Sequence, residues 1–136
     1  MSVSTAIEWN SALEQCGGDV DFLKEILGDF MTESAQALQA IVDGMRTRQF
    51  VVVMKAGHQI KGSASYLSCG DIMRSASLIQ NLGNEGAASA EAEQSSRGLG
   101  EQRATSEVWA NIEQEYQNLG AYIQYLERAI AQKFEA

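Results

Sequence analysis

The pattern that decides the fold lies near the start of the chain, where residues 20–45 read VDFLKEILGDFMTESAQALQAIVDGM. Apolar residues recur there every three or four positions, as one buried helix face requires. They are Phe22, Leu23, Ile26, Leu27, Phe30, Met31, Leu38, Ile41, Val42 and Met45. Asp19 stands directly before the stretch, where an N-cap residue is expected. The pattern therefore predicts one long amphipathic helix over residues 20–45.

Four further segments carry helical patterns. A short helix is predicted over residues 7–16, a third helix over 49–67, a fourth over 72–82 and a last, long one from about 106 to 130. Proline, the commonest helix breaker, does not occur in the sequence. Residues 84–104 are mostly Gly, Ser, Ala, Glu and Gln, a composition that predicts a flexible or partly helical connection.

Amphipathic helices of this length bury their apolar faces by packing against one another. The chain has 136 residues, of which 45% are hydrophobic and 21% are charged, so it is long enough for one domain with its own core. We therefore expect an all-α protein, a mostly antiparallel four-helix bundle with a short additional N-terminal helix. Residues 1–136 are expected to form this single domain.

Composition also narrows the function. The net charge of −8 argues against binding to nucleic acid or to an anionic membrane surface. The apolar runs are short and the N-terminus has no hydrophobic leader, so we expect a cytoplasmic protein and leave entry into the nucleus open. One histidine and two cysteines, Cys16 and Cys69, are too few for a zinc site made of Cys and His alone. Both cysteines are expected to be free thiols.

The third predicted helix places the only histidine away from the core. Five apolar residues at helical spacing form its expected core stripe, namely Val53, Ala56, Ile60, Ala64 and Leu67. His58 falls on the opposite side of the helix, together with Lys55, Lys61, Gly62 and Ser65. We therefore expect the imidazole ring to project into solvent.

Three residues of this face have a chemical interpretation. An exposed imidazole such as His58 is largely neutral and nucleophilic near pH 7. The Lys61 ammonium can pair with a dianionic group placed on that ring. Glycine costs about 1 kcal/mol in a helix interior, so Gly62 indicates either clearance for a bulky partner or packing against a neighbouring helix. Residues 51–80 hold three basic residues and one acidic residue, a small positive region in an acidic chain.

The residues around His58 resemble a known motif. Residues 56–65 read AGHQIKGSAS, which is similar to the phosphoacceptor motif His-x-x-Lys-Gly-Ser of histidine-containing phosphotransfer (HPt) domains. The motif continues with small residues and then a Leu or Ile, a position that Leu67 fits. The sequence resembles most closely the stand-alone eukaryotic intermediates of plants and yeast, and IQNLG at residues 79–83 is similar to the yeast form. The similarity covers about residues 7–83.

The resemblance implies a role for each residue of the face. His58 would be the phosphoacceptor, Lys61 would stabilise the charge of the phosphoryl group, and Gly62 would leave clearance for a partner. Gln80, on the next helix, would lie beside the histidine. The residues expected to support the site are Gln59, Ser65, Gln80 and Lys55. The sequence departs from the yeast type at Asn84, where that type has a basic residue.

Together these features predict a phosphorelay intermediate. We expect His58 to accept a phosphoryl group from a receiver-domain aspartate of a hybrid histidine kinase and to pass it to an aspartate of a response regulator. Such a carrier is not an enzyme and needs no cofactor or metal of its own, because the receiver would supply Mg²⁺. The chain is expected to be a monomer. The residues expected to bind these partners, unless the core buries them, are Ile7, Trp9, Phe22 and Ile26.

Three other functions remain as alternatives. The first is a structural or adaptor bundle in which His58 is an ordinary surface residue. The second is the dimerisation helix of a histidine kinase, which resembles His-Glu-x-x-x-Pro, whereas Gln59 follows the histidine here and proline is absent. The third is an enzyme with His58 as general base or with Cys16 or Cys69 as nucleophile. It is the weakest, because no carboxylate shares the face of the histidine to orient the ring.

Overall fold

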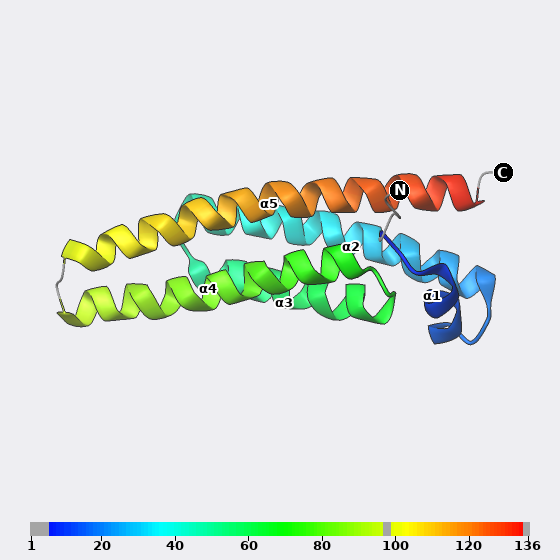
Figure 1. The fold of residues 1–136 in the computed structure, drawn as a ribbon, viewed down its shortest axis with the longest axis horizontal. Helices are drawn as coiled ribbons and strands as arrows, with labels where there is room; N and C mark the ends of the chain where they lie inside the picture. Colours follow the sequence, from blue (N-terminus) through cyan, green and yellow to red (C-terminus); the bar gives the residue numbers. More distant parts are fainter. Residues whose placement is uncertain (1–5, 97–98, 135–136) are drawn as a thin grey trace, which may run out of the picture.

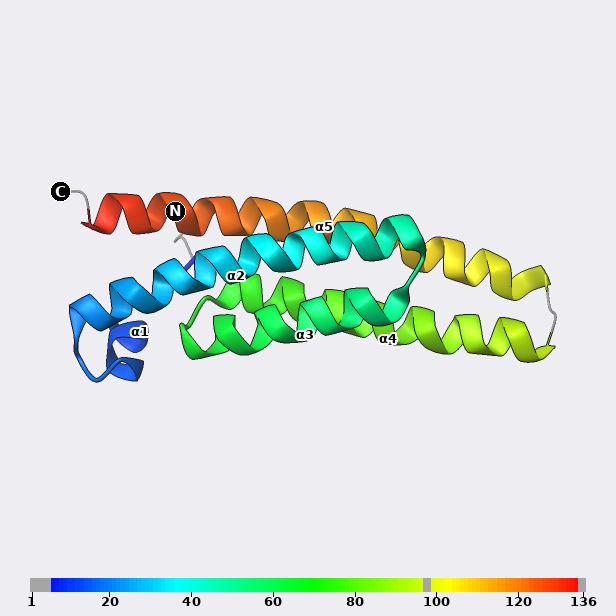
Figure 2. The same ribbon diagram turned by 180° about the vertical axis from the view of Figure 1, so that it is seen from behind.

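The computed structural model describes residues 6–96 and 99–134 (Figure 1). It contains, in chain order, α1 (Trp9–Gln15), α2 (Val20–Thr47), α3 (Phe50–Tyr66), α4 (Gly70–Ser96) and α5 (Leu99–Phe134). No strand occurs in these residues. The four long helices run lengthwise side by side, each antiparallel to the next, and α1 lies at one end, near the start of α2 (Figures 1 and 2). The predicted all-α helical bundle is confirmed.

Local sequence sets where α2 begins and ends. The Asp19 carboxylate accepts a hydrogen bond from the Phe22 backbone N–H at 3.0 Å, which confirms the predicted N-cap. At the other end Arg48 adopts the left-handed conformation with a φ of 57°. The Gln49 backbone N–H then donates to the Gly44 carbonyl oxygen at 2.9 Å. This turn reverses the chain, so that α3 runs back along α2.

The core lies between the four long helices. All five residues of the predicted stripe on α3 are buried, namely Val53, Ala56, Ile60, Ala64 and Leu67. They belong to one cluster with apolar residues of the other long helices, among them Leu27, Ile41, Ile72, Ile79, Ile112, Leu119 and Leu126. Burial of apolar surface contributes about 25 cal/mol per Å². Turning α3 about its axis would expose this stripe, so the core fixes which side of α3 faces solvent.

The fourth helix is longer than predicted. The sequence predicts an end at Leu82, followed by a flexible or partly helical connection over residues 84–104. In the structure α4 continues to Ser96 and α5 begins at Leu99, so the segment is helical on both sides of residues 97–98, which lie outside the described part of the chain. The prediction of an early helix end was therefore wrong.

Close packing against α3 accounts for the first part of this extension of α4, at Gly83 and Gly86. A Cβ atom at Gly83 would lie 2.8 Å from the Met54 backbone nitrogen, and a Cβ atom at Gly86 would overlap the Phe50 ring. Phe50 in turn stacks on Trp109 of α5, with ring centroids 3.9 Å apart. Helices in proteins are stabilised mainly by such tertiary packing. The two glycines therefore serve contact between helices and do not end one.

The outer surface of the bundle carries few large apolar side chains. Those that are exposed in the described residues are Val20, Phe22, Val51, Tyr66, Leu78 and Tyr125. Neither described segment contains a helix that is both long enough and apolar enough to span a bilayer.

Candidate functional site

The side of α3 that faces away from the core carries the only histidine of the chain. His58 is exposed, as predicted, and so are Lys55, Gly62 and Ser65. Lys61 is half-buried. A second protein can therefore reach the imidazole ring without any opening of the bundle.

The surface one helical turn beyond His58 is open at Gly62. A Cβ atom at this glycine would have no neighbouring atom within 4 Å, the atoms of its own helix backbone aside. Packing against a neighbouring helix, one of the two explanations offered by the sequence, is therefore wrong. What Gly62 leaves is free space above the helix, one turn from the imidazole.

On the α4 side, the turn that carries His58 is closed by a backbone contact. A Cβ atom at Gly57 would lie 2.8 Å from the Gln80 backbone nitrogen and 2.9 Å from the Ala76 carbonyl oxygen. Only glycine allows two helices to approach this closely. The contact places Gln80 against the residue that precedes His58. The Gln80 side-chain oxygen is buried and has no hydrogen-bond partner in the described structure, so one acceptor is left unused beside this turn.

On the α2 side, a carboxylate joins the two helices. Glu33 accepts a hydrogen bond from the Gln59 side-chain amide at 3.0 Å and another from the Ser63 hydroxyl at 2.6 Å. The two donors are one turn apart on α3 and lie on either side of Lys61 and Gly62 in sequence. The sequence gives no signal for the contact of Glu33 with these two donors, because the partners are separated by 26 and 30 residues.

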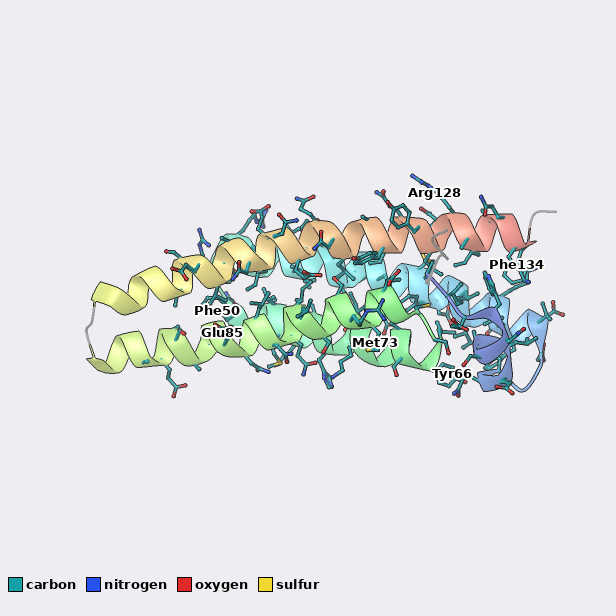
Figure 3. The ribbon with its side chains drawn as sticks, viewed as in Figure 1. Phe50, Tyr66, Met73, Glu85, Arg128 and Phe134 are labelled. Carbon is teal, nitrogen blue, oxygen red and sulfur yellow. The ribbon has the colours of Figure 1, made fainter. Side chains whose placement is uncertain are left out.

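A groove between α2 and α3 begins where Gly62 leaves the surface open. Its volume is about 420 Å³, and its lining residues are Ile26, Asp29, Phe30, Glu33, Gly62, Ser63, Tyr66 and Leu67. The neighbouring course of α2 and α3 is visible in Figure 2, and Tyr66 is labelled at the α1 end of α3 in Figure 3. Four of the lining residues are apolar or aromatic and two carry carboxylates. The solvent-facing side of α3 formed by Lys55, His58, Lys61, Gly62 and Ser65, which we call the acceptor face, therefore continues into a recess lined by both apolar and acidic side chains.

Comparison with protein families supplies the decisive observation, since the Hpt domain model matches residues 25–132. The chain belongs to the Hpt domain family. Members of this family are phosphocarrier modules rather than catalytic enzymes, and they act in histidine phosphotransfer with the receiver domains of two-component phosphorelays. A comparison with curated proteins found no match. The match covers α3 entirely, including the helix face described above.

The four residues predicted to bind partners have different positions in this Hpt domain. Phe22 is 41% exposed on α2, and Ile26 is half-buried in the groove. Trp9 is half-buried and packs edge-to-face on Phe134, whose position at the end of α5 is labelled in Figure 3. The assignment of Ile7 is corrected, because this side chain is only 7% exposed and belongs to the core. Ile7 is therefore unable to contact a partner.

The backbone explains the burial of Ile7. The next residue, Glu8, donates its backbone N–H to the Ser68 carbonyl oxygen at 3.0 Å. The Ser68 hydroxyl is also hydrogen-bonded to that of Ser11, at 2.8 Å. These bonds hold the start of the described chain against the turn between α3 and α4, so the apolar side chain of Ile7 is directed into the bundle.

Charges at the acceptor face of this Hpt domain are not paired with one another. The ion pairs found in the described residues are Arg46 with Asp43 and Arg74 with Asp71, and neither includes Lys61 or Glu33. The same residues contain no group of three or more His, Cys, Asp or Glu side chains that could hold a metal ion. The Lys61 ammonium is thus not held by a carboxylate of the described chain.

The two cysteines are free thiols, as predicted, and the structure shows that both are buried. Burial raises the pKa of the Cys69 thiol from 9.0 to about 12, because the thiolate loses its hydration. A thiol is a poor nucleophile unless it is ionised. Cys69 is therefore chemically inert at neutral pH in the folded domain.

Proposed function

We propose that His58 accepts a phosphoryl group from a receiver-domain aspartate of a hybrid histidine kinase and passes it to an aspartate of a response regulator. The observation that carries this proposal is the exposed imidazole on α3 of an Hpt domain, with open space at Gly62 one turn away. The face must be accessible to two different receivers in turn. We expect this exchange to be made by a monomer in the cytoplasm, and we leave entry into the nucleus open.

The transfer needs alignment more than covalent chemistry from the carrier. A neutral ring nitrogen of His58 attacks the phosphorus of the aspartyl phosphate, so a P–N bond forms while the P–O bond to the aspartate breaks. The carboxylate leaves, and the other ring nitrogen keeps its proton. In the second transfer a receiver carboxylate attacks the same phosphorus and the imidazole leaves. The receiver brings Mg²⁺ to both steps.

The neighbours of His58 supply charge and orientation in this proposal. The Lys61 ammonium neutralises part of the charge on the transferred group, as charge-assisted contacts to phosphate do. Gln80 has a buried side-chain oxygen without a hydrogen-bond partner in the described residues, and we assign it to accepting a hydrogen bond from the ring N–H. Lys55 and Ser65 are exposed on the same face and flank the docked receiver. The Gln59 amide instead donates to Glu33, so we assign it to holding α2 and α3 together.

Label transfer tests the proposal directly. The purified chain is incubated with a receiver domain carrying ³²P on its aspartate, and protein-bound phosphate is tested for the acid lability and alkali stability of phosphohistidine. Wild type is expected to take up such label, and the His58→Gln variant, whose helix content is checked by circular dichroism, is expected to take up none. Equal labelling of the variant refutes the assignment of His58. Binding of receivers without any label on wild type favours the adaptor alternative.

A further inference from the structure

The groove beside the acceptor face holds a carboxylate that no cation neutralises. Both oxygens of Glu33 accept hydrogen bonds from neutral donors, the Gln59 amide and the Ser63 hydroxyl. No ion pair of the described residues includes Glu33 or its neighbour in the groove, Asp29. Lys55, on the same side of α3, is not paired with either. The negative charge is therefore held beside α3 by two side-chain hydrogen bonds and has no ion-pair partner among the described residues.

We infer that Glu33 is a specificity-determining residue for the receiver domain, which must bring a cationic side chain, Lys or Arg, to the rim of this groove. The inference rests on the proposed function and adds the charge of the partner to it. The receiver surface that fits would combine an apolar side chain, which enters between Ile26 and Tyr66, with a cation beside it. A receiver with a carboxylate at that position would be rejected.

Burying an unpaired charge is costly, and this cost favours a cation on the receiver. A protein that docks over His58 covers the open space at Gly62 and, with it, the groove in which Glu33 lies. A carboxylate removed from water loses its hydration, and this loss is severe unless an opposite charge or further donors replace it. The two donors that Glu33 already has are neutral. A receiver that supplies a cation avoids the loss, whereas one that supplies an apolar surface does not.

The surrounding charges favour the same partner. Asp21, Glu25, Asp29 and Glu33 follow one another at four-residue spacing on α2, and the first three are exposed. Such a row of like charges on one helix gives this side of the groove a negative potential. On α3, Lys61 is turned about 60° from His58 and Gln59 about 100° in the opposite sense. Lys55 and Lys61 flank His58 on α3, each about 60° away and on opposite sides. The carboxylates lie on α2, beyond Gln59. A docked receiver would therefore meet positive charge beside the histidine and negative charge along α2, and this polarity would fix its orientation.

A purely structural role for Glu33 makes different predictions. If the Glu33 carboxylate only joins α2 to α3, then removing one of its hydrogen-bond donors should affect phosphoryl transfer as much as removing the carboxylate does. Ser63→Ala removes the 2.6 Å hydrogen bond and keeps the charge. Glu33→Gln keeps an acceptor oxygen and removes the charge. The two variants therefore separate charge from attachment.

The test uses the receiver domain that exchanges label fastest with the wild-type chain. The rate of phosphoryl transfer from the phosphorylated receiver to unphosphorylated His58 is measured as a function of receiver concentration. The measurement is made at low and at high salt and gives a maximal rate and an apparent KM for the receiver. Glu33→Gln is expected to raise KM about tenfold and to weaken its salt dependence, with the maximal rate changed less than about twofold. Glu33→Asp and Ser63→Ala are expected to stay within about threefold of wild type. Glu127→Gln, an exposed carboxylate on α5, serves as the matched control and should change nothing.

Each outcome has a distinct meaning. An unchanged KM for Glu33→Gln, a lowered KM, or an equal rise for Ser63→Ala overturns the inference and leaves the phosphotransfer proposal intact. A fall in the maximal rate alone also overturns it, because a docking residue acts on KM. If wild type takes no label from any receiver, the proposed function fails first, and the inference fails with it.

Discussion

Alanine substitutions at two glycines of α3 should have opposite effects on stability. Gly57→Ala would place a methyl group 2.8 Å from the Gln80 nitrogen and 2.9 Å from the Ala76 carbonyl oxygen, closer than carbon atoms approach backbone groups. Overpacking of this kind costs about 1–3 kcal/mol, and the better helix propensity of alanine returns about 1 kcal/mol. Because the obstacle is backbone and the helices must separate, we expect the overpacking cost to lie in the upper part of this range, about 2–3 kcal/mol. The net loss of stability is then about 1–2 kcal/mol.

Gly62→Ala is the matched control, because its methyl group would meet no atom within 4 Å. Only the propensity term remains, so this variant should gain up to about 1 kcal/mol. Thermal unfolding followed by circular dichroism measures both, and each kcal/mol corresponds to about 3–4 °C in Tm for a domain of this size. Label transfer should move the other way for Gly62→Ala, falling although the fold is more stable, because the added group occupies the docking space.

The prediction is refuted if the two variants shift Tm in the same direction. A higher Tm for Gly57→Ala would mean that α4 can move away from α3 with no loss of stability. The close backbone contact would then not define the position of Gln80. A destabilised Gly62→Ala would mean that this glycine contacts part of the protein after all. An unchanged transfer rate in Gly62→Ala would remove clearance as the reason for the glycine.

Three further predictions follow from single groups. Lys61→Ala should lower the maximal transfer rate about tenfold, as loss of a charge-assisted contact does, with receiver affinity measured separately by titration. Above pH 9 the unfolded Cys69 thiol loses its proton while the folded thiol keeps it up to a pKa of about 12, so its contribution to stability falls by about 1.4 kcal/mol per pH unit. In urea unfolding, the free energy of unfolding should fall less steeply above pH 9 for Cys69→Ala than for wild type. An equally steep fall in both proteins would contradict this prediction. Asp19→Ala should lower the free energy of unfolding by about 1 kcal/mol, because the N-cap hydrogen bond from the Phe22 backbone N–H is lost. The loss is measured as a lower urea midpoint.

Features set by neighbouring residues along one helix could be predicted from the sequence. The burial of the α3 stripe and the exposure of His58 follow from a period of 3.6 residues, and the cap at Asp19 follows from its place before the apolar run. The acceptor motif is also local, since its residues lie within one and a half turns. Local pattern therefore located the face of α3 before any tertiary contact was known.

Features that depend on contact between distant segments could not be predicted in this way. A glycine in the sequence can mark the end of a helix or a site where a second helix packs closely, and the residue type is the same in both cases. At Gly83 and Gly86 the nearby residues of α3 show that close packing is the reason. Hydrophobicity alone does not show whether Ile7 contacts a partner or lies in the core. Ile7 is buried because the next residue, Glu8, is hydrogen-bonded through its backbone to Ser68 in the turn between α3 and α4. The Glu33 contacts span α2 and α3 and leave no periodic trace.

The two flanks of His58 are built on different principles, and the difference bears on function. Toward α4, backbone lies against backbone at Gly57, and this contact fixes the position of the helix turn that carries His58 relative to the Gln80 backbone. Toward α2, the helices are joined by side chains of Glu33, Gln59 and Ser63, which can change partner. A carrier that meets two receivers needs a constant position for the helix turn that carries the histidine and an adaptable surface around it. The rigid contact serves the first requirement, and the polar groove serves the second.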